Sequence, residues 1–363
     1  MYDYTVDPEG DVILTLSNPN VPFAIWSEDK PLVNGPPAVP VTFRVSSRHL
    51  ILASPVFKAA LTGGWKEGIK AQNGCLKIGA EGWDVDAMLI AMNIIHCRMN
   101  RVPFVLDLEM VAKLAVLVDY YQLHDAFYSH KMHWISALKN SFPRSLGREL
   151  MLWMCIAWVF DDGEIFTDAT HIALQCHTGY LQTLGLPIPS TAIGMSGLPI
   201  TVVNLGRKVV NLGRKVELRR SVAIAALVGA LHELMEALLD NSRGCSFECR
   251  SILLGALRKQ LHGLKVLHPE VEPPFQGCSL EEAVKRVEGI KDPVWCSSRA
   301  LSSNLGWDGR RNSSSSHYYN QSCRLHSCSL KKMIEPHLHQ TKDAMTGLNL
   351  SQFKKTEEEC TLQ

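Results

Sequence analysis

The sequence has no excess of charge of either sign. Its 37 lysine and arginine residues are balanced by 36 aspartate and glutamate residues, which gives a formal net charge of +1 at pH 7. Proteins that bind nucleic acid or anionic membranes through their overall electrostatic field carry a marked positive charge. The near-neutral balance excludes that global attraction and leaves only local basic segments as candidates for phosphate contact.

Long uninterrupted apolar runs are also missing. The longest is Leu150–Phe160, with 11 residues, whereas a transmembrane helix needs about 20. Ser221–Leu239 is longer but is interrupted by His232, Glu233 and Glu236. The first ten residues are acidic and polar, unlike a secretory or mitochondrial presequence. We expect no membrane span and a location in the cytoplasm, the nucleus or both.

The motifs of the common enzyme classes are absent. The sequence has no glycine-rich phosphate loop, no G-x-S-x-G nucleophile elbow and no dinucleotide-binding fingerprint. The stretch from His232 to Glu236 resembles half of a zinc-protease motif but lacks the second histidine, which leaves an ordinary i, i+4 pair on a helix. We therefore predict no catalytic residues and no cofactor, and we expect that the protein is not an enzyme.

What the chain does contain is the composition of a globular protein. Hydrophobic residues make up 46% and charged residues 20% of its 363 residues, which is enough chain for two domains with real cores. The 11 cysteines, with no secretory leader before them, indicate thiols in a reducing compartment rather than a disulfide framework.

The most strongly specified segment is Val45–Lys66, which predicts two short helices joined at a proline. Ser47 is the candidate N-cap of the first helix. Pro55 cannot lie inside one long helix without removing a backbone hydrogen bond, but it fits the first helical position after Ser54 as N-cap. One face of the pair carries the apolar side chains of Leu50, Ala53, Phe57 and Leu61.

This segment reads S-S-R-H-L-I-L-A-S-P-V-F-K-A-A-L, follows the strand Phe43–Val45 and precedes Trp65-Lys-Glu. It resembles the BTB/POZ domain, and most closely the uncharacterised BTB proteins of filamentous fungi. The resemblance covers about residues 10–125 and implies an α+β domain of short strands and helical hairpins that self-associates as a homodimer. In some relatives it also implies recruitment of a cullin-type ubiquitin ligase scaffold, although no substrate-reading module is recognisable here. The motif residues, mostly expected in the core, are Phe43, Val45, Ser47, Leu50, Ser54, Pro55, Phe57, Leu61 and Trp65. Their outward neighbours Arg48, His49 and Lys58 are the candidate interface.

The flanking residues predict a strand–helix order of the same kind. Asp84 is the candidate N-cap of a helix that runs through His96, and a strongly amphipathic helix follows at Leu108–Tyr121. The proline-rich residues 30–40 predict a loop. The expected strands are 11–16, 23–26, 41–45 and 75–78, the first two joined by the turn-rich residues 17–20.

The rest of the chain predicts an all-α domain over residues 126–292. Residues 1–9 are expected to form an N-terminal tail. Residues 293–322 are rich in serine and asparagine and predict a disordered linker, because they bury too little apolar surface to offset chain entropy. Residues 323–363 form a short C-terminal tail whose apolar part, up to residue 350, can dock on the helices. The predicted helices are 125–138, 146–160, 167–177, 217–240, 247–261 and 279–288, the last with the capping box Ser279-x-x-Glu282.

A perfect tandem copy of N-L-G-R-K-V stands within residues 203–216. A seven-residue copy keeps Leu205, Val209, Leu212 and Val216 on one helical face. We favour a slip duplication over a selected feature. The copy also creates much of a basic run at 207–220, formed by Arg207, Lys208, Arg214, Lys215, Arg219 and Arg220. We favour a solvated helix face; the alternative is a transcription- or chromatin-associated regulator that contacts phosphate through this run.

The cysteine and histidine spacing offers one weak metal candidate. Zinc needs ligands that converge tetrahedrally, and Cys245 and Cys249 lie one helical turn apart. His262, His268 and Cys278 follow, and Cys323, His326 and Cys328 could complete the ligand set across the linker. Because the spacing does not fit a CxxC zinc knuckle, we favour buried thiols and predict no metal. The candidates that we retain are Cys245, Cys249, His326 and Cys328.

Overall fold

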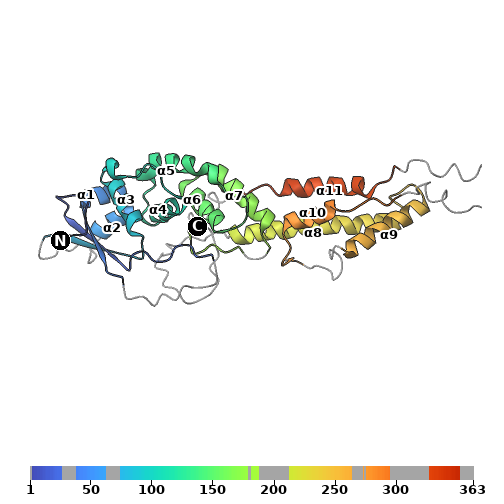
Figure 1. The fold of residues 1–363 in the computed structure, drawn as a ribbon, viewed down its shortest axis with the longest axis horizontal. Helices are drawn as coiled ribbons and strands as arrows, with labels where there is room; N and C mark the ends of the chain where they lie inside the picture. Colours follow the sequence, from blue (N-terminus) through green and yellow to red (C-terminus); the bar gives the residue numbers. More distant parts are fainter. Residues whose placement is uncertain are drawn as a thin grey trace, which may run out of the picture. The chain divides into compact units, whose positions relative to one another are not determined.

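The chain is mixed α/β and divides into two compact units (Figure 1). The computed structural model describes residues 2–26, 38–62, 74–178, 181–187, 212–263, 273, 275–294 and 327–351. The N-terminal unit contains Met1–Ala173, Tyr180–Val216 and Gly347–Gln363. The helical unit contains Leu174–Gly179 and Glu217–Thr346. Helices beyond residue 125 therefore pack with the residues expected to form the first domain.

A four-stranded sheet in the order β1-β3-β2-β4 forms one side of the N-terminal unit. β2 (Val12–Ser17) pairs antiparallel with β3 (Val41–Val45) and parallel with β4 (Leu76–Glu81). β1 (Tyr4–Thr5) pairs parallel with the other edge of β3. Alternate residues of β2 are buried, as expected of a strand with one face on a core.

The predicted strand at residues 23–26 is wrong, because these residues take no part in the sheet. Ala24 has a positive φ of 49°, which does not fit a strand. The Arg148 guanidinium donates hydrogen bonds to the carbonyl oxygens of Phe23 and Ala24, at 3.1 and 2.9 Å. The neighbour of β2 is instead β3, which follows the proline-rich residues 30–40.

The helices of the N-terminal unit follow the predicted order closely. Asp84 caps α3 through the Ala87 N–H, as predicted, and the helix expected at Leu108–Tyr121 has those bounds. The longest apolar run lies in α6, where nearly every residue is buried. The elements are α1 (Ser47–Ala53), α2 (Pro55–Thr62), α3 (Val85–Ile95), η2 (Met99–Arg101), α4 (Leu108–Tyr121), α5 (His124–Leu138), η3 (Lys139–Ser141), α6 (Arg148–Phe160) and α7 (Gly163–Cys176).

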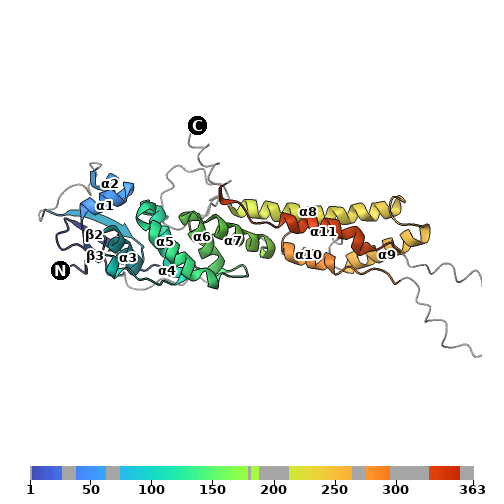
Figure 2. The same cartoon turned by 90° about the horizontal axis from the view of Figure 1, so that it is seen from above.

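In its described residues, the helical unit has four helices that lie side by side around an apolar core (Figure 2). They are α8 (Leu212–Leu239, from Glu217 onward in this unit), α9 (Phe247–Gly263), α10 (Leu280–Glu288) and α11 (Leu330–Ala344). The Ser279 half of the predicted capping box is confirmed, because the Glu282 N–H donates to Ser279 Oγ, while the Glu282 carboxylate accepts from Arg286. The core includes Leu231, Leu253, Leu257, Val284, Leu330 and Ile334.

Some predictions for the second half of the chain differ from the structure, and others concern residues that it does not describe. α8 begins five residues before the predicted Glu217 and includes residues 212–216 of the second heptad copy, of which Leu212 and Val216 are buried. The first copy, at residues 203–209, lies outside the described residues, as do the predicted disorder over residues 295–322 and Trp65. α11 was not predicted as a helix; its residues were expected only as the apolar part of the C-terminal tail, and Pro336 lies inside it.

The expectation that no segment is long and apolar enough to cross a membrane is wrong for α8. By length and composition alone this helix qualifies, with a mean hydropathy of 1.8 over its most apolar window. Its apolar side chains include Ala223, Ile224, Leu227 and Leu231, which line the core of the helical unit. Packing against α9, α10 and α11 accounts for these side chains, whereas Leu218, Val222 and Leu239 of the same helix are exposed.

Candidate functional site

Ser54 fixes the junction of α1 and α2, as predicted. Its Oγ accepts the Phe57 N–H at 3.0 Å and donates to the Tyr121 carbonyl at 2.6 Å, so one hydroxyl both caps α2 and ties it to the end of α4. Pro55 begins α2. The predicted core residues Leu50, Phe57 and Leu61 are buried, and the Phe57 ring stacks on Tyr121.

The predicted role of Ser47 as N-cap is wrong. Ser47 is the first residue of α1, and Ser46 precedes it without a side-chain capping bond. The N–H and Oγ of Ser47 instead donate to the two carboxylate oxygens of Asp11, at 2.8 and 2.7 Å. Asp11 therefore acts as the acceptor at the start of α1, although it lies 36 residues away in the sequence.

The candidate interface residues are not all directed outward. Arg48 and Lys58 are exposed, but His49 is half-buried and stacks on His96 with ring centroids 4.8 Å apart. The most exposed apolar side chain of α1 is Leu52, at 86%. Its position two residues after the buried Leu50, and so on the opposite side of the helix, was the signal that could have identified it.

His96 holds the start of α1 from the end of α3. Its Nε2 accepts the Ser46 N–H at 2.8 Å, and its Nδ1 lies 2.8 Å from the Met92 carbonyl. The ring is therefore neutral, with the proton on Nδ1. Burial lowers the pKa of His96, and the neighbouring His49 and Arg98 act in the same direction.

The stability of the N-terminal unit is expected to fall as the pH drops below about 6.5, the ordinary pKa of histidine. Because the pKa of His96 is lowered in the folded state, the unfolded chain takes up the proton first, and stability is lost between the unfolded and the folded pKa. Denaturant unfolding followed at about pH 7.5 and pH 5.5 measures this difference. His96→Asn should show a smaller pH dependence, and an equal one would contradict the prediction.

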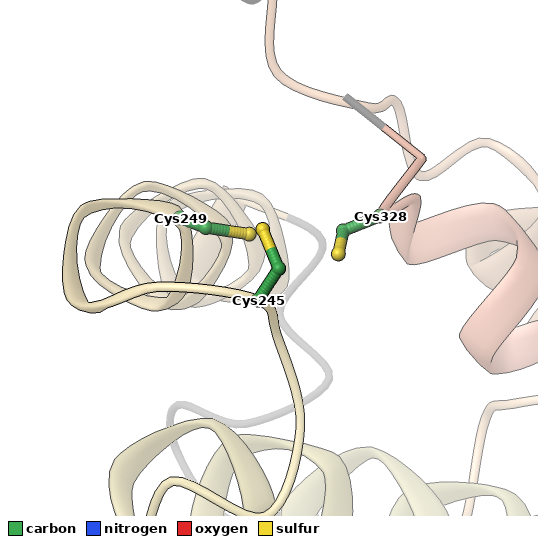
Figure 3. A group of neighbouring side chains, drawn as sticks. All are labelled: Cys245, Cys249 and Cys328. Carbon is green, nitrogen blue, oxygen red and sulfur yellow. The ribbon is translucent and has the colours of Figure 1, made fainter. Parts of the chain in front are cut away.

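A second group of side chains gathers in the helical unit. The sulfur atoms of Cys245, Cys249 and Cys328 all lie within 4.8 Å of one another (Figure 3). Cys245 lies in the turn between α8 and α9, Cys249 in the first turn of α9, and Cys328 two residues before α11. Cys249 is buried, Cys328 is half-buried and Cys245 is exposed. The structure thus joins three of the four retained metal candidates; the fourth, His326, lies outside the described residues.

The thiols of Cys245 and Cys249 differ in acidity. Desolvation within the cluster raises the pKa of Cys245 to about 11, and hydrogen bonds to Cys249 and Cys328 add to this. For Cys249, burial also acts to raise the pKa, but hydrogen bonds from the Cys245 backbone and from the thiols of Cys245 and Cys328 outweigh it, so the pKa is lowered. Of these two thiols, Cys249 therefore carries the negative charge more readily.

The other metal candidates do not join this group within the described part of the chain. Cys278 is half-buried, and its thiol donates to the Ser279 carbonyl. His262 is exposed near the far end of α9. His268 and Cys323 fall on residues that the structure does not describe.

The basic run is not a uniform solvated face. Arg220 is fully buried and pairs with Glu217 through Nη2 at 2.6 Å and Nε at 3.2 Å. Its Nη1 donates to the carbonyl oxygens of Phe275 and Cys278. His177 also contacts the Glu217 carboxylate, at 2.9 Å. The predicted solvated face is wrong for Arg220, which instead joins α8 to the carbonyl groups of Phe275 and Cys278 inside the helical unit. Arg214 and Arg219 are exposed, Lys215 is half-buried, and Arg207 and Lys208 lie outside the described residues.

Comparison with known proteins gives no independent assignment. No protein-family model matches the chain, and no curated protein matches it.

Proposed function

We propose that residues 10–125 form a BTB/POZ domain and that the protein self-associates through this domain as a homodimer. The observation that carries the proposal is the placement of the Ser54-capped helix pair α1–α2 between β3 and β4. β2 pairs antiparallel with β3 and parallel with β4, and the helices α3, α4 and α5 follow. This is the order of elements that the resemblance of the Val45–Lys66 segment implies.

The surface proposed for self-association lies on α1 and the start of α2. Leu52 is 86% exposed, and Arg48 lies one helical turn before it on the same side of α1. Pro55 and Lys58 are exposed on α2. In a two-fold dimer the same patch meets itself, so each Leu52 would be buried by the partner while the charged side chains remain at the rim.

We further propose that the N-terminal unit recruits a cullin-type scaffold. A separate apolar surface of the N-terminal unit is suited to a different chain: Tyr128 and Met132 lie one turn apart on α5 and are mostly exposed. Phe104 is also exposed, and its ring contacts His133 with centroids 3.8 Å apart. The chromatin-associated alternative loses support, because the buried Arg220 is not available to phosphate.

Leu52→Glu is expected to convert the dimer into a monomer. Burial of a leucine side chain contributes about 1.5–3 kcal/mol, and the dimer loses two such contacts and gains two buried charges. We expect a dissociation constant raised by roughly 100-fold or more. Size-exclusion chromatography with light scattering on the full chain measures it.

Leu218→Glu is the matched control for this experiment. Leu218 is also an exposed leucine on a helix, but it lies on α8 in the helical unit and is not part of the N-terminal unit that carries α1. The control variant should remain a dimer. A wild-type chain that is monomeric at tens of micromolar, or a Leu52→Glu variant that stays dimeric, would refute self-association through α1.

A further inference from the structure

We propose that Cys245, Cys249 and Cys328 form a zinc site that fastens the start of α11 to the turn between α8 and α9. This proposal does not depend on the proposed self-association. It concerns residues of the helical unit alone.

The distances between the three sulfur atoms suit a tetrahedral metal. At a Zn–S distance of about 2.3 Å, two thiolates of one tetrahedron lie about 3.8 Å apart. The sulfurs are already within 4.8 Å of one another without a metal (Figure 3). Rotation of the cysteine side chains that moves the sulfur atoms about 1 Å closer together is enough to reach this separation, so the helices need not rearrange.

The backbone around Cys249 and Cys328 is held in place independently of any metal. Cys249 follows the cap of α9, where its N–H donates to Ser246 Oγ at 3.2 Å. Cys328 precedes Ser329, whose Oγ caps α11 and donates to Asp292 at 2.8 Å. The next residues of α11 are anchored by the buried Leu330 and Ile334. Two elements separated by more than 70 residues of sequence therefore present their sulfurs to one point before metal binds.

Two helix N-termini lie at the cluster, and their partial positive charge accommodates thiolates bound to a soft cation. All three cysteines lie at or just before helix N-termini, Cys245 and Cys249 at α9 and Cys328 at α11, where the backbone N–H groups favour negative charge. Three thiolates around Zn²⁺ leave a net charge of −1, which the two helix ends accommodate. Thiolate ligands select zinc over hard cations such as Mg²⁺ or Ca²⁺.

The chemical step is ligand exchange without oxidation or reduction. Each thiol releases its proton to solvent as its sulfur donates an electron pair to Zn²⁺, which loses bound water in return. The described residues supply three of the four ligands of a tetrahedral site. A site of this kind adds its binding free energy to the stability of the helical unit.

The test is the zinc content of the full chain, purified under reducing conditions, loaded with zinc and desalted. We expect one zinc ion per chain by elemental mass spectrometry. Cys249→Ser and Cys328→Ser should each lower the zinc affinity by more than about 100-fold, because even outer-shell partners of zinc contribute 10- to 100-fold. The controls are Cys97→Ser, on the N-terminal unit, and Cys278→Ser, a half-buried cysteine outside the cluster; both should retain zinc.

Two further measurements keep the proposal falsifiable if a serine variant folds poorly. X-ray absorption at the zinc edge of the wild-type chain should count at least three sulfur neighbours at about 2.3 Å. Hydrogen exchange across residues 327–344 should accelerate when a chelator removes the metal. Fewer than three sulfurs, no zinc in the wild type, full retention by Cys328→Ser, or a Cys245–Cys249 disulfide found by thiol mapping of freshly quenched cells would each overturn the site.

Discussion

Replacement of Arg220 by methionine is expected to destabilise the helical unit by about 3–5 kcal/mol, the cost of removing one partner of a buried ion pair. The substitution leaves the Glu217 carboxylate without its two-point partner and the carbonyls of Phe275 and Cys278 without their donor. Methionine matches the apolar stem of arginine but supplies no hydrogen bonds. Hydrogen exchange should therefore rise across residues 217–294, while the peptides of residues 74–173 keep their protection.

Arg219→Met and Arg220→Lys separate this role from the effects of charge and length. Arg219 is exposed and adjacent in sequence, with a single hydrogen bond to the Thr346 carbonyl, so its loss should cost little. Lysine cannot reproduce a planar guanidinium that contacts a carboxylate at two points and two carbonyls at once, so Arg220→Lys should not restore stability. Equal stability of the Arg219 and Arg220 variants would show that the buried network contributes nothing.

Arg220 also illustrates where reasoning from sequence stops. Six basic residues within fourteen positions indicate an exposed, charged face, and that holds for Arg214 and Arg219. The buried carbonyls that Arg220 serves belong to Phe275 and Cys278, more than 50 residues away. No local pattern records such a partner. The same limit applies to Asp11 at the start of α1 and to His96 beneath it.

Features that depend on neighbouring residues could be predicted well. Ser54 with Pro55, Asp84, and Ser279 with Glu282 each mark a helix start through chemistry within three or four residues, and the structure has helices beginning there. The strand expected at residues 23–26 failed because strand formation depends on a partner, and the neighbouring position beside β2 is taken by β3.

The thiol cluster lies between these two cases. The pairing of Cys245 with Cys249 is visible as one helical turn of spacing, and Cys328 could be proposed only as one of several distant cysteines. The convergence of Cys328 on the other two depends on α11 packing into the core through Leu330 and Ile334. The sequence alone favoured buried thiols, because the spacing of Cys245 and Cys249 does not fit a CxxC zinc knuckle.

Replacement of Gly347 by alanine is expected to release the segment 347–350 from α7. A methyl group at Gly347 would overlap the carbonyl oxygen of Thr167 and lie 2.6 Å from its carbonyl carbon. Both are backbone atoms, so no rotamer change relieves the overlap. The adjacent Leu348 donates its N–H to Thr170 Oγ1 at 2.7 Å and accepts from Thr167 Oγ1 at 3.2 Å. A shift of the segment breaks both hydrogen bonds.

Release of this segment exposes Leu348 and Leu350, each worth about 1.5–3 kcal/mol of burial. Hydrogen exchange of the peptide containing residues 345–351 should therefore approach that of an unprotected chain, and limited proteolysis should cleave there first. Gly163→Ala is the matched control, because a methyl group at that position of α7 meets nothing within 4 Å. The docking of residues 347–350 on α7 would be refuted if Gly347→Ala retained the protection of the wild type, since no unstrained arrangement accommodates the added carbon in the docked state.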